Sequence, residues 1–583
     1  MKPRKVKLLK RPGQIPQLGK EILVLAGLLT LIISPSQTID AFNPPKFALL
    51  VLGVFYLGLR YWKMIWQGLS RKKVLLTFLS LLTILFSGLI ANTYSISERL
   101  FGVAGRNFGF VTLVALILVG LYSFQATTDN LLKASGILNG LAITNFGVVF
   151  VFFLQQTGVL FNDFQNEYMV MPSTLGNPNF LSAFIGISLL GVFNWIFQNR
   201  TKYILVAIGL AASFSSLYIV IVSQSIQGLI VILMSISLLF LFSSLRFPSK
   251  LLRFALVLFF GLVSLIFVSG FLNFGPLGEQ LSQRTLGNRL IYWKIAFRIF
   301  LDSPLTGKGF DSYLDHYREF ITNEDIEVLG KGVISDSPHN IFLDVFVSAG
   351  LFSGLFFIVL LFVAIFRIFN CIREDVKFKK YDVSRNSLYS IFLSLLAISF
   401  ISPFQIGLFV WLPIITGFLL GANSKKVLEN LKRSGIFEGA FKNAAAITLG
   451  ASILVCNPIF AALPFNTEVK FRTAVEESSF TKLDEVALAW PFSGPRAISI
   501  AEGFMASTIT PSADPLDPEI LGQLEFLRMR ALEIAWKTVR INERQFEGWR
   551  FLLENSRDPG VEDEASQKLN GLDPTNPAWK PSP

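Results

Sequence analysis

The segment PNFLSAFIGISLLGVFNWIFQNRTKYILVAIGLAASFSSLYIVIV, residues 178–222, decides the fold class. It holds two runs of mostly apolar residues, and about twenty such residues form a helix long enough to cross the hydrocarbon core of a bilayer. The link between the runs, QNRTK, is polar and basic. The segment therefore predicts two transmembrane helices joined by a short turn.

The same alternation of apolar runs and short polar links extends over residues 1–463. The chain of 583 residues is 52% hydrophobic and only 16% charged, with a mean hydropathy of +0.55, whereas soluble domains carry about 25% charged residues. We predict an all-α, polytopic bundle of about 12–13 transmembrane spans. The candidate spans are residues 21–39, 46–64, 73–91, 107–124, 134–157, 178–198, 202–222, 225–243, 251–272, 340–369, 386–403, 405–422 and 443–463.

The distribution of basic residues predicts the orientation of the bundle. The N-terminus and most alternate links are rich in lysine and arginine, whereas the links between them are poor in both. Basic links lie on the cytoplasmic side, so we place the N-terminus in the cytoplasm. An odd number of spans then puts the tail outside. The resulting organisation is a basic N-terminus at 1–20, spans 1–9 in 21–272, an extracytoplasmic loop at 273–339, spans 10–13 in 340–463 and an extracytoplasmic helical tail at 464–583.

Net charge and cysteine content exclude two other classes of protein. The net charge is +12, but the basic excess lies in links between apolar runs, so no folded basic domain is left to bind nucleic acid. Cys371 and Cys456 are too few for a disulfide framework, and no Cys/His spacing typical of a metal site occurs. We expect two buried or inert thiols and no bound metal.

The extracytoplasmic loop contains one clear helical pattern, at about residues 287–302. Its apolar side chains recur at i, i+3 and i+4, and its basic side chains take other positions. We expect an amphipathic helix on the outer bilayer surface, whose arginines either meet lipid phosphates or belong to a site. The apolar positions are Leu290, Trp293, Phe297 and Phe300 or Leu301, and the basic ones are Arg289, Lys294 and Arg298.

Two short motifs follow this helix in the loop. PLTGKGF, residues 304–310, predicts a tight turn at Gly307 and Gly309, and it is a weak indication of phosphate binding because no strand precedes it. SDSPHN opens the next span, with Ser337 suited to cap the helix and Pro338 to its first position. We therefore expect a polar helix start that faces outward.

Histidine occurs twice, as His316 and His339. His339 falls in the expected first turn of the span, where the helix dipole disfavours a protonated imidazole, and a neutral imidazole is what a general base needs. A single histidine at a helix end is usually structural, and Arg289 in the same loop is what makes this one a candidate. His316 lies in the polar stretch YLDHYREF, and we expect it on the solvated surface.

Taken in order, several residues resemble the O-antigen ligase and O-antigen polymerase superfamily of bacterial polytopic membrane proteins. The number of spans, and a large external loop before a span that opens with His-Asn, match as well. The resemblance covers about residues 20–463. The motifs that carry it are Arg289–Leu290–(x)2–Trp293, Pro304–Leu305–x–Gly307–x–Gly309, His339–Asn340–(x)2–Leu343 with Gly350, GNPNF at 176–180, and Gly105–Arg106.

The resemblance implies an enzyme. Members transfer a glycan from an undecaprenyl-diphosphate carrier to a lipid, glycan or protein acceptor at the outer face of the bacterial cell (inner) membrane, with no cofactor, metal or nucleotide sugar. It also implies that His339 is the general base and that Arg289 holds the diphosphate. The further residues expected to contact substrate are Arg106, Asn177, Asn179, Gln227, Arg284, Lys308, Asn340 and Asp344.

The chain departs from the family pattern in one place. Many members carry an arginine in a Ser-Arg-Gly stretch at the start of one span, whereas this chain has SQSIQGL at 223–229. Gln224 or Gln227 can hydrogen-bond a phosphate or sugar but brings no charge, so a second cation would have to come from Arg106 or Arg284. This departure leaves open that the protein is a degenerate, non-catalytic member of the superfamily.

The tail has helical apolar spacing, clearest in LEFLRMRALEIAWKTVRI at 524–541. INERQFEGW and LDPTNPAW resemble the ends of tetratricopeptide-type repeats, although the period of roughly 34 residues is not clean. Two interpretations are equally open. The tail is either a docking platform for a partner or acceptor, or a small helical cap on the membrane domain.

Three functions follow from these observations. The first is transfer of a lipid-linked glycan, by a ligase or a polymerase. The second is a transporter or channel. The near-absence of charge inside the spans argues against coupled ion transport, though not against passive conduction. The third is a non-catalytic scaffold that gathers a polysaccharide machinery through the tail, which the missing arginine keeps open.

Overall fold

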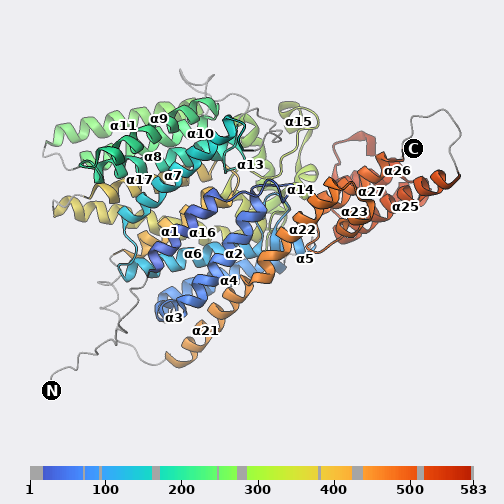
Figure 1. Cartoon of the computed structure of the whole chain (residues 1–583), viewed down its shortest axis with the longest axis horizontal. Coiled ribbons are helices and arrows are strands. Elements are labelled where there is room, and N and C mark those ends of the chain that lie inside the picture. Colours follow the sequence, from blue (N-terminus) through green and yellow to red (C-terminus); the bar gives the residue numbers. More distant parts are fainter. Residues whose placement is uncertain are drawn as a thin grey trace.

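The computed structural model describes residues 17–69, 72–90, 95–160, 171–245, 249–271, 285–378, 382–422, 438–508 and 518–579. Within these ranges all regular secondary structure is helical and no strand occurs. Long helices form a bundle, and a smaller group of helices lies beyond one end of it (Figure 1). The predicted all-α class is confirmed.

A helix occupies each predicted span. Of the described helical segments, seven are long and apolar enough to cross a membrane: α6 to α10, α16, and Ile447–Glu476, which joins α21 and α22. The fold is therefore that of a polytopic helical membrane protein, while the count of 12–13 spans stays a prediction. The helices of the bundle are α1 (Leu18–Leu31), α2 (Asn43–Arg60), α3 (Trp62–Leu69), α4 (Lys72–Ile90), α5 (Ile96–Phe101), α6 (Phe110–Thr128), α7 (Ala134–Gln156), α8 (Pro178–Gln198), α9 (Tyr203–Val222), α10 (Ile226–Ser244), α11 (Lys250–Phe271), α16 (Ile341–Lys377), α17 (Val383–Ser399), α18 (Ile406–Phe409), α19 (Trp411–Gly421), α21 (Glu438–Val455) and α22 (Pro458–Glu476).

Close approach of helix backbones at glycine builds the centre of the bundle. α6 and α19 pack along their length, and a Cβ on Gly417 would lie only 2.2 Å from the carbonyl oxygen of Gly120. Small residues allow such contacts in membranes, where apolar side chains gain little over lipid tails. Trp411 of α19 is fully buried and donates to Thr30 Oγ1 at 3.2 Å, which fixes α19 to α1.

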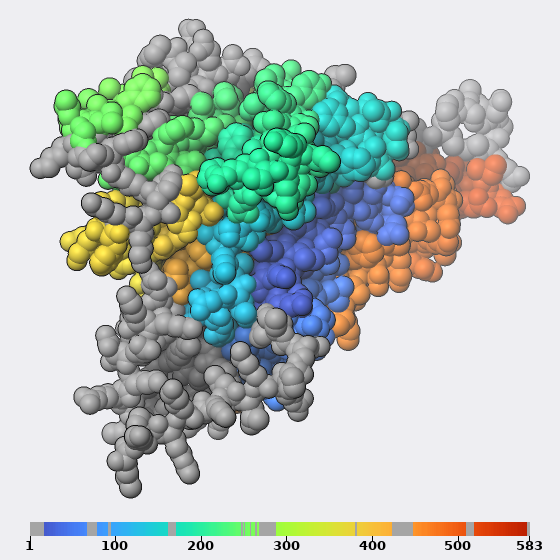
Figure 2. Space-filling model, turned by 60° about the vertical axis from the view of Figure 1, so that its left-hand side comes forward, coloured from blue at the N-terminus to red at the C-terminus, as the bar shows by residue number. Residues whose placement is uncertain are grey.

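One side of the bundle is apolar and exposed. Figure 2 shows α9, α10 and α11 in green tones along this side. A soluble surface rarely carries so large an apolar patch, so this side suits lipid contact. The side chains that are at least 63% exposed there are Tyr203, Ile204, Phe214, Ile221, Leu251, Phe254 and Leu265.

The helix predicted at 287–302 is present as α13 (Thr285–Asp302), which lies with α14 (Tyr313–Phe320) and α15 (Asn323–Leu329) at the end of the bundle nearest the tail (Figure 1). α13 has two apolar faces. The predicted face carries Leu290, Phe297 and Leu301, which are 46%, 53% and 57% exposed. Periodicity did not reveal the second face, where Ile291, Ile295 and Ile299 are buried in a cluster shared with α14, α15 and α16.

The boundary predicted at 463/464 falls inside a helix. α22 runs through it, packing on α2 in the bundle and on α23 in the tail. The tail helices pack in sequence around their own apolar core, so the helical prediction is confirmed, while a tetratricopeptide array stays a prediction. These helices are α23 (Phe480–Ala487), α24 (Gly494–Ala506), α25 (Pro518–Ile541), α26 (Phe546–Asn555) and α27 (Pro559–Leu572), followed by a 3-10 turn at Pro577–Trp579.

α16 is broken at Gly350, whose φ of +77° and ψ of −173° are not helical. The turn at 304–310 fills the break with its own backbone. The two segments therefore satisfy each other's peptide groups, as buried irregular backbone requires. The bonds run from Lys308 N–H to Val347 O (2.7 Å), from Gly309 N–H to Ser348 O (3.0 Å) and from Leu351 N–H to Pro304 O (2.7 Å).

The glycines of this turn serve packing against α16. Gly307 has a φ of +71°, and a Cβ on it would lie 2.6 Å from the backbone nitrogen of Ala349. The N–H groups of Lys308 and Gly309 are already bonded to α16. The indication of phosphate binding in PLTGKGF is therefore explained by the broken helix.

Gly307→Ala should destabilise the protein by about 1–3 kcal/mol, because the new Cβ meets backbone and an alanine is held at positive φ. Gly261→Ala in α11 is the control, since a Cβ there meets nothing within 4 Å and alanine favours helix. Thermal unfolding in detergent compares the two variants. Equal melting temperatures would contradict the role given to Gly307.

Candidate active site

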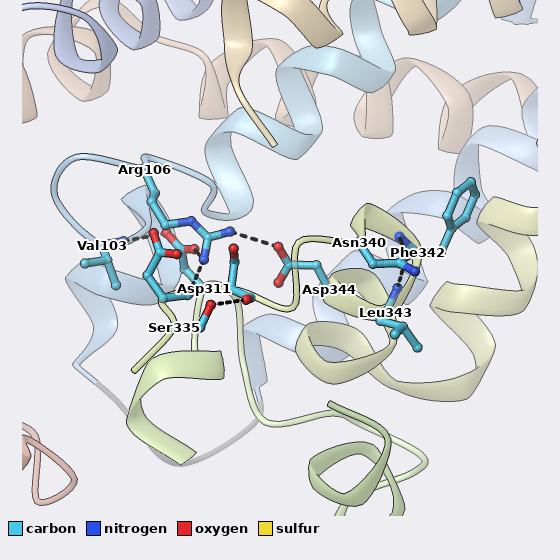
Figure 3. A network of polar contacts seen from close by, with 10 residues as sticks. Val103, Arg106, Asp311, Ser335, Asn340, Phe342, Leu343 and Asp344 are labelled. Atoms are coloured by element: carbon cyan, nitrogen blue, oxygen red, sulfur yellow. Dashed lines mark hydrogen bonds and ion pairs between the residues drawn. The ribbon is translucent and has the colours of Figure 1, made fainter. Parts of the chain in front are cut away.

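The start of α16 is fixed by Asn340. Its Oδ1 accepts from the backbone N–H groups of Phe342 (3.0 Å) and Leu343 (3.1 Å) (Figure 3). The predicted cap at Ser337 is wrong, because His339 adopts a φ of +49° that cannot belong to a helix. The chain turns at His339, and Asn340 becomes the cap in an extended conformation. His339 therefore precedes the first turn.

Arg106 joins three segments at this end of the bundle (Figure 3). Its Nη2 lies 2.8 Å from Asp344 Oδ2, and its Nη1 lies 3.0 Å from Asp311 Oδ1. Nη1 also donates to the carbonyl oxygen of Asp336 at 2.6 Å. Arg106 precedes α6, Asp311 precedes α14, and Asp344 lies in the first turn of α16. One guanidinium between two carboxylates thus holds these segments together.

This ion-pair network bears on the roles predicted for its members. Both carboxylates are almost fully buried, with side-chain exposures of 0% for Asp311 and 1% for Asp344. Their charges compensate that of Arg106, so Arg106 is occupied as a structural cation in this structure. Contact of Arg106 or Asp344 with substrate stays a prediction.

His339 lies against α13. Its ring stacks on that of Tyr292, with centroids 5.8 Å apart and planes inclined by 26°. Arg289 is three residues before Tyr292, and residues at i and i+3 lie on the same helix face. The structure therefore brings the two residues predicted as catalytic, Arg289 and His339, to one place.

The Arg289 guanidinium is a buried cation. The side chain is 6% exposed, and across the described ranges no carboxylate lies within ion-pairing distance of it. Burial lowers the pKa of Arg289 to about 10. Since an unpaired buried charge is costly and guanidinium groups bind phosphate bidentately, this position suits an anionic group of a ligand.

The His339 imidazole is neutral above about pH 4. Burial, then the charges of Arg289 and Arg106, lower the pKa of His339 to about 4, while Asp336 acts in the opposite direction. The neutral form was predicted, but burial and two arginines produce it. Nδ1 of His339 is buried and has no hydrogen-bond partner within the described part of the chain, so this nitrogen can serve a ligand.

Three other predicted residues form a polar cluster at the starts of α8 and α10. Asn177 caps α8 by accepting from the Asn179 N–H at 2.8 Å. Asn179 Oδ1 accepts from Ser225 Oγ at 2.8 Å. Gln227 is 4% exposed, and among the described residues its Oε1 finds no hydrogen-bond donor. Contact of this cluster with substrate stays a prediction.

The remaining candidates have different outcomes. Lys308 forms an ion pair with Asp302. Arg284 lies outside the described residues. The surface position predicted for His316 is wrong: the residue is fully buried, and its Nδ1 lies 3.2 Å from the carbonyl oxygen of Ser312. α14 is amphipathic, and the side that carries His316 faces the interior of the protein. Cys371 and Cys456 are buried and free, as predicted.

Sequence reasoning missed Tyr292 and Asp311. Tyr292 could have been found, because it follows Arg289 by one helical turn and breaks the apolar pattern with a polar ring. Asp311 had no such indication. Only the turn at 304–310, seated in the break of α16, carries it to Arg106.

Arg289→Gln should raise the pKa of His339 above its value of about 4, because a cation that opposes imidazolium is removed. Histidine-selective NMR titration measures this, and His316→Asn assigns the signals, since the chain has two histidines. Lys294→Gln is the control, because Lys294 lies on the exposed side of the same helix. An unchanged titration in Arg289→Gln would place Arg289 too far away to act on His339.

Arg106→Leu should destabilise the protein by about 3–5 kcal/mol, because two buried carboxylates lose their cation. Adding Asp311→Asn and Asp344→Asn should recover part of the loss. Arg540→Leu, which breaks an exposed ion pair with Glu564, should change stability little. Denaturant unfolding tests this, and a tolerated Arg106→Leu would show that the network does not hold the segments.

A comparison with known protein families finds a match to the part of the chain that contains these residues. Residues 211–358 match the family model described as O-antigen ligase. The match runs from α9 through α13–α15 to the spanning part of α16, so it contains Arg289, the turn at 304–310, and His339. No curated protein matches the chain. Over residues 211–358 the chain is therefore similar to the O-antigen ligase family.

Proposed function

We propose that the protein transfers a glycan from an undecaprenyl-diphosphate carrier to an acceptor hydroxyl at the outer face of the cell membrane. One observation carries the proposal. Within the described ranges, the buried guanidinium of Arg289 has no acidic partner, and it lies beside the neutral imidazole of His339, whose Nδ1 has no hydrogen-bond partner there either. Glycan transfer from a diphosphate carrier requires an anion-binding group next to a general base.

Arg289 acts on the leaving group. When the bond between the sugar and the diphosphate breaks, negative charge develops on the phosphate oxygen. A guanidinium held in place by burial stabilises that charge without reorganising, in the role that a metal ion plays elsewhere. Arg289 lies at the end of the bundle. This position suits a donor whose lipid tail stays in the bilayer while the diphosphate head group extends beyond it.

His339 acts on the acceptor. A neutral imidazole takes the proton of the acceptor hydroxyl as the oxygen attacks the anomeric carbon. With a pKa of about 4 in the empty site, His339 is a weak base. A bound diphosphate brings negative charge beside Arg289, which offsets the cation and raises the pKa of His339 toward neutrality. The base therefore becomes effective when the donor is present.

One feature of the structure is typical of transporters, and another argues against a transport function. Broken helices such as α16 are typical of carriers. Here the break at Gly350 is filled by the backbone of 304–310, and the 27 residues that follow it in α16 extend about 40 Å, enough to cross the membrane unaided. The break therefore seats a loop and opens no path. The scaffold alternative predicts no transfer at all.

A reconstituted transfer assay with undecaprenyl-diphosphate-linked glycans tests the proposal. His339→Ala should lower the transfer rate by about 10²–10⁴-fold, the usual contribution of a general base. Arg289→Ala should lower it as well, with weaker donor binding. Lys294→Ala, which removes an exposed cation from the same helix, should keep wild-type activity.

The outcomes separate the three functions. Release of undecaprenyl diphosphate by wild type at a rate that both variants match would overturn the residue assignment. No release with any donor and acceptor, from folded wild type, would favour the scaffold or the transporter.

A further inference from the structure

α14 makes the main polar contact between the outer loops and the tail. The tail side of α14 presents charged residues to the turn after α25 and to the start of α26. These contacts are Arg318 to Glu547 (3.1 Å), Arg318 over the ring of Phe546 (3.9 Å to the centroid), and Glu319 to Arg544 (2.5 Å). The tail is therefore docked on α14 by paired charges.

Two carboxyl groups meet at the centre of this contact. Glu98 of α5 is 5% exposed, and Asp315 of α14 is partly buried. The amide of Asn542, from the tail, lies between them, with its Nδ2 3.4 Å from Glu98 Oε2 and 3.1 Å from Asp315 Oδ2. Arg318 and Arg544 at this contact form their ion pairs with Glu547 and Glu319. One tail amide thus bridges two acids of the outer loops.

Docking changes the protonation of these acids. Burial and the neighbouring Asp315 raise the pKa of Glu98 to about 8, and burial raises the pKa of Asp315 to about 7. Exposed carboxyl groups titrate near pH 4, so the two acids take up protons when the tail docks. The uptake of these protons then contributes fully to the stability of docking below about pH 4. This contribution is lost as the pH rises through 7 to 8.

Other charged groups around the pair modify this titration. Asp311 raises the pKa of both acids, whereas Arg544 lowers that of Asp315. Burial lowers the pKa of His316, which follows Asp315 in α14 and stays neutral. Further charged residues on the elements packed here include Arg99 on α5, Arg318 and Glu319 on α14, Arg106 beside Asp311, and Glu543 and Glu547 on the tail. Arg496 lies on α24, whose Gly494 N–H donates to Glu98 Oε1 at 3.4 Å.

We propose that protonation of Glu98 and Asp315, whose carboxyl groups both contact Asn542, holds the C-terminal helices on the outer loops, so that alkaline pH loosens the tail and, through α14, the His339 site. The tail is then a pH-responsive regulator of the membrane domain. The effect on catalysis rests on the function proposed above, whereas the docking switch does not.

The opposite side of α14 supports the candidate active site. Tyr313 donates to the carbonyl oxygen of Tyr292 at 3.0 Å, and the rings of Tyr317 and Tyr292 have centroids 6.1 Å apart. Tyr292 in turn stacks on His339. Asp311, which holds Arg106, lies directly before α14. A shift of α14 on release of the tail therefore moves the groups that hold His339.

Hydrogen exchange measured by mass spectrometry on the full-length protein in nanodiscs tests the docking switch. Between pH 6 and pH 9, after correction for intrinsic exchange, wild type should lose protection in α14 and in residues 542–549. The loss should approach tenfold per pH unit for each proton released. Glu98→Gln should keep its protection at pH 9, because the amide stays neutral there, as the protonated carboxyl group is at lower pH.

Two further variants make the result decisive. Asp315→Asn should also abolish the pH dependence, and it replaces Glu98→Gln if that variant does not fold. Glu554→Gln removes one charge from an exposed position of the tail and should switch like wild type. Protection that is equal at pH 6 and pH 9 in wild type, or lost equally in wild type and both amide variants, would overturn the proposal.

A transfer assay at both pH values separates this proposal from the proposed function. Wild type should lose activity at pH 9 together with protection, and Glu98→Gln should retain it. If exchange switches but no variant transfers glycan at any pH, the proposed function fails and the docking switch stands. If exchange switches and activity does not follow, the coupling through α14 is wrong.

Discussion

The ion pairs of Arg106 with Asp311 and Asp344 are the interaction on which the end of the bundle nearest the tail depends. The three residues come from the loop before α6, the loop before α14 and the first turn of α16. Removing one partner from a buried ion pair is strongly destabilising, so displacement of any of these segments would leave a buried charge unpaired. The network fixes the start of α16, and with it the position of His339.

The broken helix extends the same constraint into the backbone. In α16 the peptide groups freed at Gly350 are satisfied by the turn at 304–310. That turn leads into Asp311 and then α14, so the break in the helix decides where the partner of Arg106 lies. The turn at 304–310 thus packs against α16 through its own backbone, and the role of Arg289, on α13, as the phosphate-binding cation stays a proposal.

α14 connects the two halves of the protein. One side of it carries Tyr313 and Tyr317, which pack on Tyr292 and so on the ring partner of His339. The other side carries Asp315, which shares Asn542 of the tail with Glu98. Because this one helix of eight residues carries both sets of contacts, the proposed loosening of the tail would act on the site through α14.

The sequence by itself determined the all-α membrane fold, the helix at 287–302 and the pairing of Arg289 with His339 as candidates, because apolar run length and motif order are local properties. Tertiary structure decided the rest. The cap at Asn340, the burial of His316 and the partners of Arg106 depend on segments far apart in the chain. A pattern of residues shows which side chains are polar, but only packing decides which of them lose water and which partners they then need.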